Sequence, residues 1–513
     1  MVNLRAVYAH AEEHTTAYLF GLFALLTVCV VAQSLVSPFA IPALVIAVAF
    51  LIMSVRRPLW TLGFLAVWLP LESFALKFVP DDIYVFARYF SEGLVYLLCA
   101  IVLWRVISGN VKLRQTPIDL PIALFIVVLL ASTIVNLVSP TVAVLGARQI
   151  LRFILIFFVV VYLHPSRSFI RTMTAVMLAV LVVESGIGLL QPVVGEPLDQ
   201  FLLPSEARTY GDLTLTAGVQ QTWDYGSRIF ATFGRYDRLG NFLYFFLLIA
   251  VGLLYEPSVR KGRRELWWVF ALGLPALLLT YSRASWFAFL LGFLFIGVWI
   301  KRDRRVLVAF LSFVIFVASY LAVSGLNVRF ITEAPGQTLV ERFYESFSYA
   351  RWRGEYVGFG RVFWFVQTPL TVVPASPIFG FGPGQYGGGA VAALGNTIVY
   401  EKLGLPFGTF GTDGFIDNNW FSLWGETGTL GVAFYLWAYA ALFVAAVRLY
   451  RRSDDPFVRA VAIGYAAALL GVAFNAFTSL ILETRTVAFY LWMYGGFIIV
   501  LTEPKTTRHL PTT

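Results

Sequence analysis

Apolar runs follow one another along almost the whole chain, and one long segment between residues 326 and 428 interrupts them. Most runs approach the roughly 17–25 residues that a helix needs to cross a bilayer. They lie at residues 16–34, 38–55, 58–76, 89–107, 119–138, 147–163, 170–193, 239–256, 266–281, 284–300, 306–325, 429–448, 458–481 and 486–503. This pattern predicts an all-α, polytopic membrane protein with about fourteen spanning helices, or about twelve if closely spaced runs form re-entrant hairpins.

The composition supports this class. Of the 513 residues, 59% are hydrophobic and 13% are charged, whereas a soluble domain carries about 25% charged residues. The segment before the first run lacks strong positive charge, so we interpret that run as an uncleaved helix and a cleaved signal peptide as the weaker alternative. The only cysteines, Cys29 and Cys99, lie inside apolar runs, which argues against a disulfide framework or a cysteine metal site.

Basic residues between the runs predict an orientation. Clusters of arginine and lysine, such as those at 56–57, 260–264, 301–305 and 448–452, fall on alternate connections, on the side of the N-terminus if fourteen spans are counted. Cytoplasmic connections carry such an excess of positive charge. Both termini are therefore expected in the cytoplasm, and the net charge of +9 needs no nucleic acid as a partner.

Two large connections, at about 194–238 and 326–428, fall on the opposite, external side, and their basic residues are almost all arginines. A guanidinium binds phosphate through two parallel hydrogen bonds, whereas lysine acts as a point charge. Pairing with neighbouring acids, such as Asp237, Glu355 and Glu483, is the alternative explanation for any single arginine. Amphipathic runs in the second connection predict short helices at the membrane interface, so we expect a large helical external loop.

Four polar motifs stand out on the predicted external side. They occupy residues 228–241, 280–286, 361–386 and 417–431. The second contains Ser282-Arg283 in a tight turn, the third contains the glycine run from Gly380, and the fourth joins Asp417-Asn418 to Glu426. The glycine run lacks the Gly-Lys-Ser/Thr ending of a P-loop, and we interpret it as a flexible turn that lets the loop fold back over a site.

Together these motifs resemble those of the O-antigen ligase and polymerase superfamily, which comprises bacterial integral membrane glycosyltransferases that use undecaprenyl-pyrophosphate-linked saccharides. The resemblance covers roughly residues 225–445. It implies a GT-C-like fold in the bacterial cytoplasmic (inner) membrane, with the active site facing the periplasm. We accordingly divide the chain into N-terminal helices with the first external loop (1–225), a ligase-like core (226–448) and C-terminal helices (449–513). The implied partners are the lipid-linked oligosaccharide and membrane lipids, with a flippase and a chain-length regulator as further expected partners.

The type of reaction within the superfamily depends on Asp417. Ligases that attach O-antigen to lipid A core look to use a histidine at this position, and the four histidines here are predicted to lie on the cytoplasmic side: His10, His14, His164 and His509. The resemblance therefore favours a polymerase of O-antigen or exopolysaccharide repeat units. A ligase and a lipid-linked saccharide transporter are the alternatives.

The candidate site residues follow from the chemistry of transfer from a lipid pyrophosphate. The departing pyrophosphate carries charge that arginines stabilise. Arg283 is the first candidate for this role, and the further substrate-binding candidates are Arg361, Arg228, Arg235, Arg238, Arg148 and Arg152. The acceptor hydroxyl needs a base or an orienting acceptor, for which Asp417 is the first candidate and Glu426 the second.

Asn418 and Asn419 would orient Asp417 or the sugar hydroxyls. Capping of the following helix is the alternative role for these two residues, and binding of a loop backbone or an arginine is the alternative role for Glu426. The external loops contain no Asp-x-Asp motif. We therefore expect an inverting, metal-independent glycosyltransferase without a cofactor.

Overall fold

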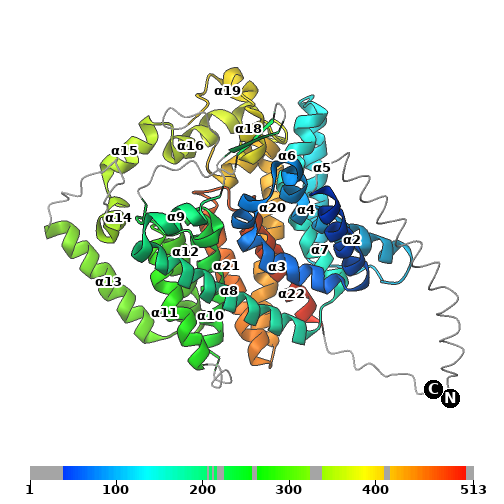
Figure 1. Ribbon diagram of the computed structural model, residues 1–513. Coiled ribbons are helices and arrows are strands. Elements are labelled where there is room, and N and C mark those ends of the chain that lie inside the picture. The colour runs from blue at the N-terminus through cyan, green and yellow to red at the C-terminus, as the bar shows by residue number, and fades with distance from the viewer. Residues whose placement is uncertain are drawn as a thin grey trace, which may run out of the picture.

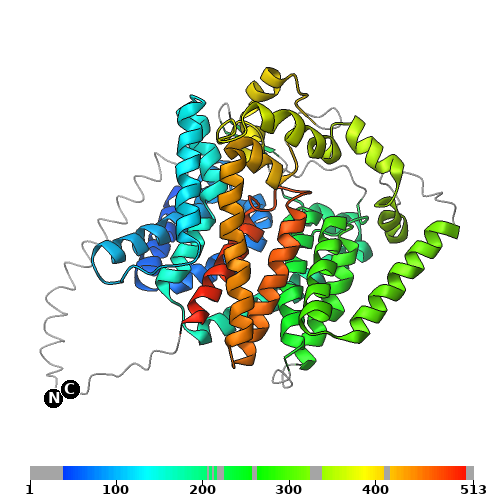
Figure 2. The same ribbon diagram turned by 180° about the vertical axis from the view of Figure 1, so that it is seen from behind.

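The regular structure of the chain is almost entirely helical. The computed structural model describes residues 39–204, 207–210, 213–216, 225–256, 263–323, 338–408 and 416–503. A bundle of long helices is covered at one end by a layer of short helices, α14 to α19 (Figures 1 and 2). Helices satisfy their backbone hydrogen bonds internally, which the waterless interior of a bilayer requires.

The elements follow the apolar pattern of the sequence. The bundle consists of α2 (Ala40–Arg56), α3 (Pro58–Ala75), α4 (Asp81–Ile107), α5 (Asp119–Val135), α6 (Pro140–Leu151), α7 (Ile154–Leu163), α8 (Arg167–Val194), α10 (Tyr236–Leu254), α11 (Arg263–Leu279), α12 (Arg283–Leu294) with its π-helical continuation η4 (Phe295–Ile300), α13 (Arg304–Val323), α20 (Asn419–Arg452), α21 (Pro456–Asn475) and α22 (Arg485–Thr502). The shorter elements are η1 (Leu76–Phe78), α9 (Glu196–Leu202), η2 (Ala231–Phe233), α14 (Leu339–Glu345), α15 (Tyr349–Val357), α16 (Arg361–Gln367), η5 (Thr368–Val372), α17 (Val373–Ala375), α18 (Gly388–Leu394) and α19 (Ile398–Leu403).

The predicted class, an all-α multi-pass membrane protein, is confirmed. Within the described residues, eight helices are long and apolar enough to cross a membrane, or nine if α6 and α7, which meet at a bend of 52°, form one span. This is fewer than the predicted twelve to fourteen. Two predicted spans, α2 and α5, are shorter apolar helices, and the first predicted span lies outside the described residues. A small hairpin is added to the helices, in which β1 (Ala207–Tyr210) pairs antiparallel with β2 (Leu213–Thr216).

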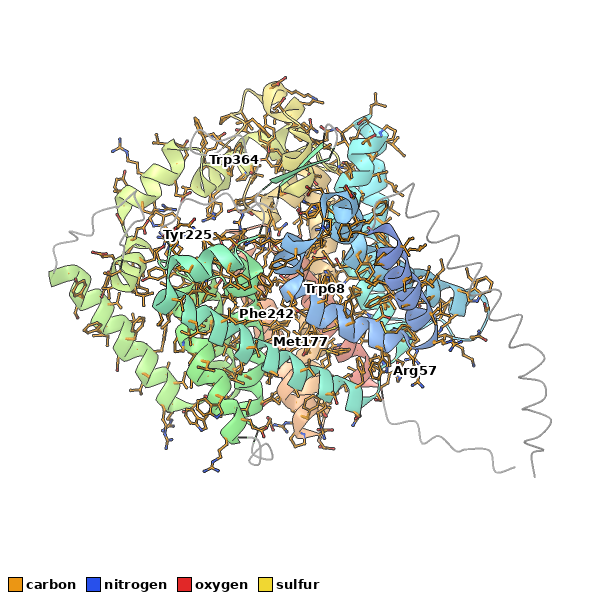
Figure 3. The ribbon with its side chains drawn as sticks, viewed as in Figure 1. Arg57, Trp68, Met177, Tyr225, Phe242 and Trp364 are labelled. Carbon is orange, nitrogen blue, oxygen red and sulfur yellow. The ribbon has the colours of Figure 1, made fainter. Side chains whose placement is uncertain are left out.

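Small residues let the central helices α10 and α21 approach closely. A Cβ atom at Gly252 would lie 2.2 Å from the carbonyl oxygen of Ala460, and one at Gly464 would lie 2.5 Å from the Cα of Ile249. Such residues are enriched where membrane helices pack, because close backbones gain dispersion contacts. Phe242 of α10 and Met177 of α8 lie within the bundle, while Trp364 lies in the layer above it (Figure 3).

The basic connections gather at one end of the bundle, as the orientation argument predicts. Lys301, after η4, and Arg459, in the first turn of α21, both pair with Glu256, which follows α10 (2.7 and 3.5 Å). Arg114 and His164 likewise meet Glu503 (2.8 and 2.9 Å). The assignment of this end to the cytoplasm remains a prediction from the excess of positive charge.

The layer of short helices has its own apolar core. Trp364 of α16, Tyr386, and Tyr400 of α19 pack together, with ring centroids 5.7 to 6.2 Å apart. The Tyr386 hydroxyl is in hydrogen-bonding contact with Thr368 (2.7 Å), and the Tyr400 hydroxyl donates to the Tyr386 carbonyl (2.6 Å). The predicted helical loop is therefore a folded unit held against the end of the bundle.

Candidate active site

The first two motifs meet where α10, α12 and α21 come together beneath the layer. The amide oxygen of Asn241, on α10, accepts hydrogen bonds from Ser285 of α12 (3.0 Å) and Asn475 of α21 (2.6 Å). Ser285 also contacts the hydroxyl of Ser282 (2.8 Å). Because these groups are buried and bonded to one another, they fix three helix ends relative to one another, and the Ser282-Arg283 turn lies at this junction.

The third and fourth motifs form a backbone ladder. Phe381 donates to the carbonyl of Gly425 (2.8 Å), and Thr429 donates to that of Pro377 (2.9 Å). Gly428 has φ +65° and ψ −172°, a conformation that essentially only glycine adopts. A Cβ atom there would lie 2.3 Å from the carbonyl oxygen of Ile378. The break at Gly428 divides α20 into a short helix in the site and the long helix predicted at 429–448.

Glu426 anchors the glycine run. Its Oε1 atom accepts hydrogen bonds from the backbone N–H groups of Gly384 (3.0 Å) and Gly387 (3.3 Å). Farther along the run, Gly389 donates to the carboxylate of Glu483 (2.8 Å). A run predicted as a flexible turn is therefore bonded along its length, because two buried carboxylates need donors and its backbone supplies them. Glu426 is not among the described residues that line the two large cavities introduced below. Its contacts are with the backbone of a loop, which is the alternative to a catalytic role.

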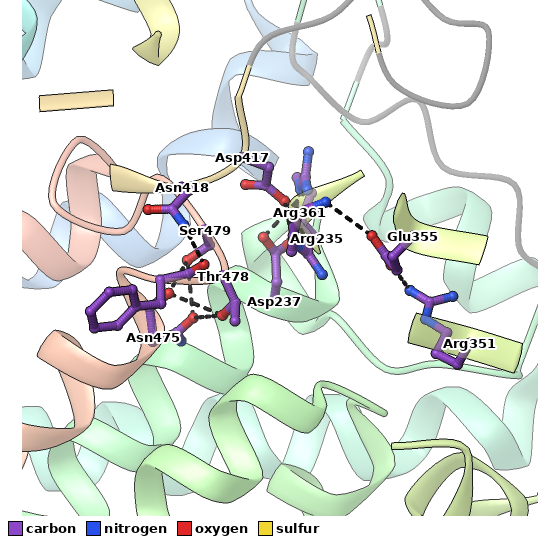
Figure 4. A network of polar contacts seen from close by, with 11 residues as sticks. Arg235, Asp237, Arg351, Glu355, Arg361, Asp417, Asn418, Asn475, Thr478 and Ser479 are labelled. Atoms are coloured by element: carbon purple, nitrogen blue, oxygen red, sulfur yellow. Dashed lines mark hydrogen bonds and ion pairs between the residues drawn. The ribbon is translucent and has the colours of Figure 1, made fainter. Parts of the chain in front are cut away.

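Asp417 and Arg361 form an ion pair at the centre of the site (Figure 4). One guanidinium nitrogen of Arg361 lies 2.5 Å from Oδ2 of Asp417, and its Nε lies 3.2 Å from the same oxygen. Both side chains are about two-fifths exposed. Although partial desolvation of the guanidinium opposes its charged form, Asp417 and Glu355 together raise the pKa of Arg361, so this arginine stays charged beside the carboxylate.

Arg283 lines a cavity of about 770 Å³, here called the Arg283 cavity. Its walls come from α10, α12, α14 to α16 and the end of α21, and they include the cationic side chains Arg235, Arg283, Arg342, Arg351 and Arg361. Arg283, Arg342 and Arg351 share one buried carboxylate, Glu345, at 3.3, 3.1 and 3.4 Å. Arg342 and Arg351 belong to the arginine-rich external connection but were not among the candidate site residues, and the sequence gives Glu345 no signal beyond its charge spacing.

A second cavity of about 500 Å³, here called the Arg148 cavity, lies on the other side of Asp417 and is lined by seven cationic residues. These are Lys77, Arg88, Arg148, Arg152, Arg235, Arg238 and Arg485. Arg148 pairs with Glu92, and Arg152 pairs with the same carboxylate and donates to the backbone oxygen of Glu483 (2.9 Å). The predicted residues Arg148, Arg152 and Arg238 are thus brought together, with Lys77, Arg88 and Arg485, which were not among the candidate site residues.

The two cavities share part of their walls. Asp417, Arg235, Asp237, Asn241 and Ser479 line both of them. Arg235 is bound to Asp237 (3.0 Å), so the shared wall holds two carboxylates and a guanidinium, with Arg361 beside them. Groups bound in the two cavities would meet at this wall.

The remaining predicted residues serve the surrounding framework. The Asn418 side chain caps α20 by accepting from the N–H of Phe421 (3.0 Å). Asn419 accepts from the N–H of Leu482 (2.7 Å). Arg228 lies over the ring of Tyr236, 4.6 Å from its centroid, and is not among the described residues lining either cavity. In the part of the chain that the structure describes, there is no group of three or more His, Cys, Asp or Glu residues that could hold a metal ion.

Comparison with known protein families matches one part of the chain. Residues 268–436 match the sequence profile of the family described as O-antigen ligase. The match runs from α11 into α20 and includes Arg283, the layer of short helices, Arg361 and Asp417. It confirms the resemblance to the O-antigen ligase and polymerase superfamily and supports a glycosyltransferase-like function on lipid-linked saccharides. A search of curated proteins found no match to the chain.

Proposed function

We propose that this protein polymerises undecaprenyl-pyrophosphate-linked oligosaccharide repeat units at the external face of the bacterial cytoplasmic membrane. The observation that carries the proposal is the position of Asp417 in a wall common to two cavities, each rich in cationic side chains. A polymerase must hold two substrates that both bear a lipid diphosphate. Two cationic cavities that share a wall containing Asp417 fit that requirement.

The reaction is a single displacement at the anomeric carbon of the donor sugar. A hydroxyl oxygen of the acceptor sugar forms the new bond while the bond from the anomeric carbon to the pyrophosphate oxygen breaks. The hydroxyl proton passes to Asp417, and the pyrophosphate leaves with the electron pair. One displacement inverts the configuration at the anomeric carbon.

The arginines of the Arg283 cavity stabilise the charge on the leaving group. Charge that develops on pyrophosphate oxygens is best stabilised by donors already fixed in place. Arg283 begins α12 and is bound to the buried Glu345, so its guanidinium is held before the substrate arrives. Arg361, in contact with Asp417, stands between the proton acceptor and the leaving group.

The test uses purified protein in lipid nanodiscs, supplied with a radiolabelled undecaprenyl-pyrophosphate oligosaccharide. The wild type should release undecaprenyl pyrophosphate and lengthen a second lipid-linked oligosaccharide, whereas Asp417→Asn and Arg283→Ala should do neither. Arg353→Ala is the matched control, because Arg353 is exposed on α15 and does not line either cavity. Normal release by both site variants would remove these two residues from the mechanism.

The same assay separates the polymerase from the ligase. Lengthening of the lipid-linked product without any other acceptor supports the polymerase. Transfer that requires added lipid A core, with no lengthening in its absence, supports the ligase. Flipping of labelled lipid across liposomes without release of pyrophosphate would favour the transporter instead.

The orientation of the site is tested separately in intact cells. Single cysteines replace Glu401 on α19, in the layer of short helices, and Asp454, between α20 and α21 at the opposite end, in a Cys29→Ser, Cys99→Ser background. A membrane-impermeant maleimide should label the first and not the second. The reverse pattern would place the cavities on the cytoplasmic side.

A further inference from the structure

Helix α8 carries a polar stripe on one face of an otherwise apolar candidate span. Glu184, Gly188 and Gln191 lie at spacings of four and three residues, which places them on the same face of a helix. Glu184 is 1% exposed, and Gln191 is fully buried. An ionisable group inside a spanning helix is costly and is by default a candidate for function, and the proposed reaction uses neither of these two side chains.

The stripe holds the segment that leads into α10. The side-chain oxygen of Gln191 accepts hydrogen bonds from the backbone N–H groups of Phe230 (2.9 Å) and Ala231 (2.8 Å). The carboxyl of Glu184 accepts one from the N–H of Thr232 (3.2 Å). Three consecutive backbone N–H groups are therefore bonded to two side chains of a single helix.

The segment needs this support because its backbone is strained. Ala231 has φ +47°, in the left-handed region that is unfavourable for any residue with a Cβ atom. Such a conformation persists only where the surroundings fix it. Gly188 allows a close approach, because a Cβ atom there would lie 2.9 Å from the side chain of Ile229. Arg235 and Asp237 follow along the chain and line both cavities, so the segment sets the position of the shared wall.

The contacts of Thr232 require a hydrogen on Glu184. The hydroxyl oxygen of Thr232 lies 2.7 Å from Oε1 of Glu184 and 3.0 Å from the carbonyl oxygen of Pro70 on α3. A threonine hydroxyl has one hydrogen to donate, and the Pro70 carbonyl can only accept. Both contacts are hydrogen bonds when the carboxyl of Glu184 donates to Thr232 and Thr232 donates to Pro70. The other carboxyl oxygen still accepts from the N–H of Thr232, so a neutral acid satisfies all three contacts.

Burial away from cations favours the same state of Glu184. In the part of the chain that the structure describes, its hydrogen bonds are with Thr232, and no lysine or arginine forms an ion pair with it. A buried carboxylate without a partner cation binds a proton rather than staying charged. Glu92, by contrast, pairs with Arg148 and Arg152.

We propose that Glu184 is a neutral carboxylic acid and acts with Gln191 as a positioning residue for Arg235 and Asp237 in the wall that the two cavities share. This inference rests on the proposed function only for what the wall does. Neither Glu184 nor Gln191 is among the described residues that line the cavities, so each acts through the backbone that it holds. Glutamine at position 184 keeps one donor and one acceptor and should replace the neutral acid.

Two measurements without substrate test the state of Glu184 and the support it gives. Infrared difference spectra of the purified full-length protein, wild type minus Glu184→Gln, should show the carbonyl stretch of a protonated carboxyl at neutral pH, and Thr232→Val should shift this band. Hydrogen–deuterium exchange of residues 228–234 should rise about tenfold or more in Glu184→Ala and Gln191→Leu, since buried hydrogen bonds are lost, and stay at the wild-type level in Glu184→Gln. An ionised carboxylate in the infrared spectrum, or equally fast exchange in Glu184→Gln and Glu184→Ala, would overturn the proposal.

A double-substitution cycle tests the positioning of Arg235. Glu184→Ala should lower kcat/KM for release of undecaprenyl pyrophosphate by about tenfold to a hundredfold, because displacement of a positioned group by roughly 1 Å can cost on the order of 10²-fold. In an Arg235→Ala background the same substitution should have a much smaller effect, since residues that act together are not additive. The control is Glu196→Gln, at an exposed position of α9, which should change kcat/KM in neither background. Equal factors for Glu184→Ala in both backgrounds would indicate general destabilisation and reject the positioning.

These outcomes are distinguishable from failure of the proposed function. A protonated Glu184 that protects residues 228–234 in a protein without transfer would retain the support of this segment and reject the glycosyltransferase. Transfer with equal factors in both backgrounds would retain the glycosyltransferase and reject the positioning role of Glu184.

Discussion

Arg361 and Asp417 contact each other beside the wall that the Arg283 and Arg148 cavities share, with a nitrogen-to-oxygen distance of 2.5 Å. Arg361 comes from the layer of short helices, and Asp417 precedes α20 of the bundle. The pair therefore joins the two parts of the protein at the point where substrates would meet. Arg361, which would stabilise the leaving group, is therefore in contact with Asp417, which would accept the proton of the acceptor hydroxyl, before any substrate binds.

Substitution of Asp417 by asparagine should remove activity and leave the fold intact. Both partners are about two-fifths exposed, and exposed ion pairs contribute only about 0–1 kcal/mol. Loss of a general base lowers rates by roughly 10²–10⁴-fold. We expect release of undecaprenyl pyrophosphate to fall by about this factor while the apparent Tm in detergent barely moves. A large fall in Tm would instead assign Asp417 to the framework.

Two arginines on α15 allow a residue of the Arg283 cavity to be compared with a neighbour outside it. Arg351 lines the Arg283 cavity and pairs with Glu345, while Arg353 is exposed. Arg351→Ala should lower kcat/KM by about tenfold to a hundredfold, because charge-assisted hydrogen bonds contribute about 1.5–3 kcal/mol. Arg353→Ala should keep kcat/KM close to the wild-type value. Equal effects of the two substitutions would indicate a general electrostatic field rather than a specific contact.

Glu426 should prove to be a stabilising residue. One of its oxygens accepts two backbone N–H groups of the glycine run, and a buried donor left without a partner costs about 1–3 kcal/mol. Glu426→Ala should therefore lower the apparent Tm, whereas Glu426→Gln keeps an acceptor oxygen and should retain most of both Tm and turnover. A catalytic carboxylate would show the opposite result, with Glu426→Gln stable and inactive.

The features that were predictable from the sequence are those with a local signal. Apolar periodicity located the bundle helices, and the turn at Ser282-Arg283 and the helix start after Asp417 follow from short-range polar spacing. The alternation of basic connections along the chain predicted which connections share one side of the membrane. Some of these connections are joined in the structure by ion pairs with Glu256 and Glu503. Within the described residues fewer helices qualify as spans than the sequence predicts, in part because apolar content does not reveal where a run bends, as between α6 and α7.

The organisation of the site was not predictable, because it depends on contacts between distant segments. The spacing of Arg342 and Glu345, or of Arg351 and Glu355, looks like a local helix pair. Only the packing of α14 against the start of α12 brings Arg283 to the same carboxylate. The division of the site into two cavities likewise requires Asp417 to lie between segments that are hundreds of residues apart.

The break at Gly428 can be tested against a second glycine with positive φ. Gly428→Ala would place a Cβ atom 2.3 Å from the carbonyl oxygen of Ile378 and strain a backbone that only glycine adopts readily, at a cost of about 1–3 kcal/mol from the strain alone. The control is Gly395→Ala. Gly395 has φ +57°, and no atom lies within 4 Å of an added Cβ atom, so this substitution should cost only the roughly 1–2 kcal/mol of placing alanine in a left-handed conformation. We expect a larger fall in apparent Tm for Gly428→Ala, together with loss of turnover.

The connection between α21 and α22 should give the protein a measurable pH dependence through Glu483. Burial raises the pKa of this carboxyl above its usual 4.5, and this effect outweighs the hydrogen bonds from Gly389 and Asn419 and the nearby charge of Arg152. A raised pKa means that the folded state binds the proton more tightly than the unfolded state, so stability falls as pH rises from about 4.5 through the folded pKa. The apparent Tm of the wild type, measured by intrinsic fluorescence across this window, should fall accordingly.

Glu483→Gln removes the titration and leaves one donor without an acceptor oxygen. The variant should therefore be less stable than the wild type at low pH, and the difference should narrow as pH rises. Glu401→Gln, on the exposed face of α19, should leave the profile of the wild type unchanged. If stability rose with pH over this window in the wild type and not in Glu483→Gln, the carboxylate would be favoured by its donors more than it is opposed by burial. The junction of the glycine run with α22 would then be held by an ionised group.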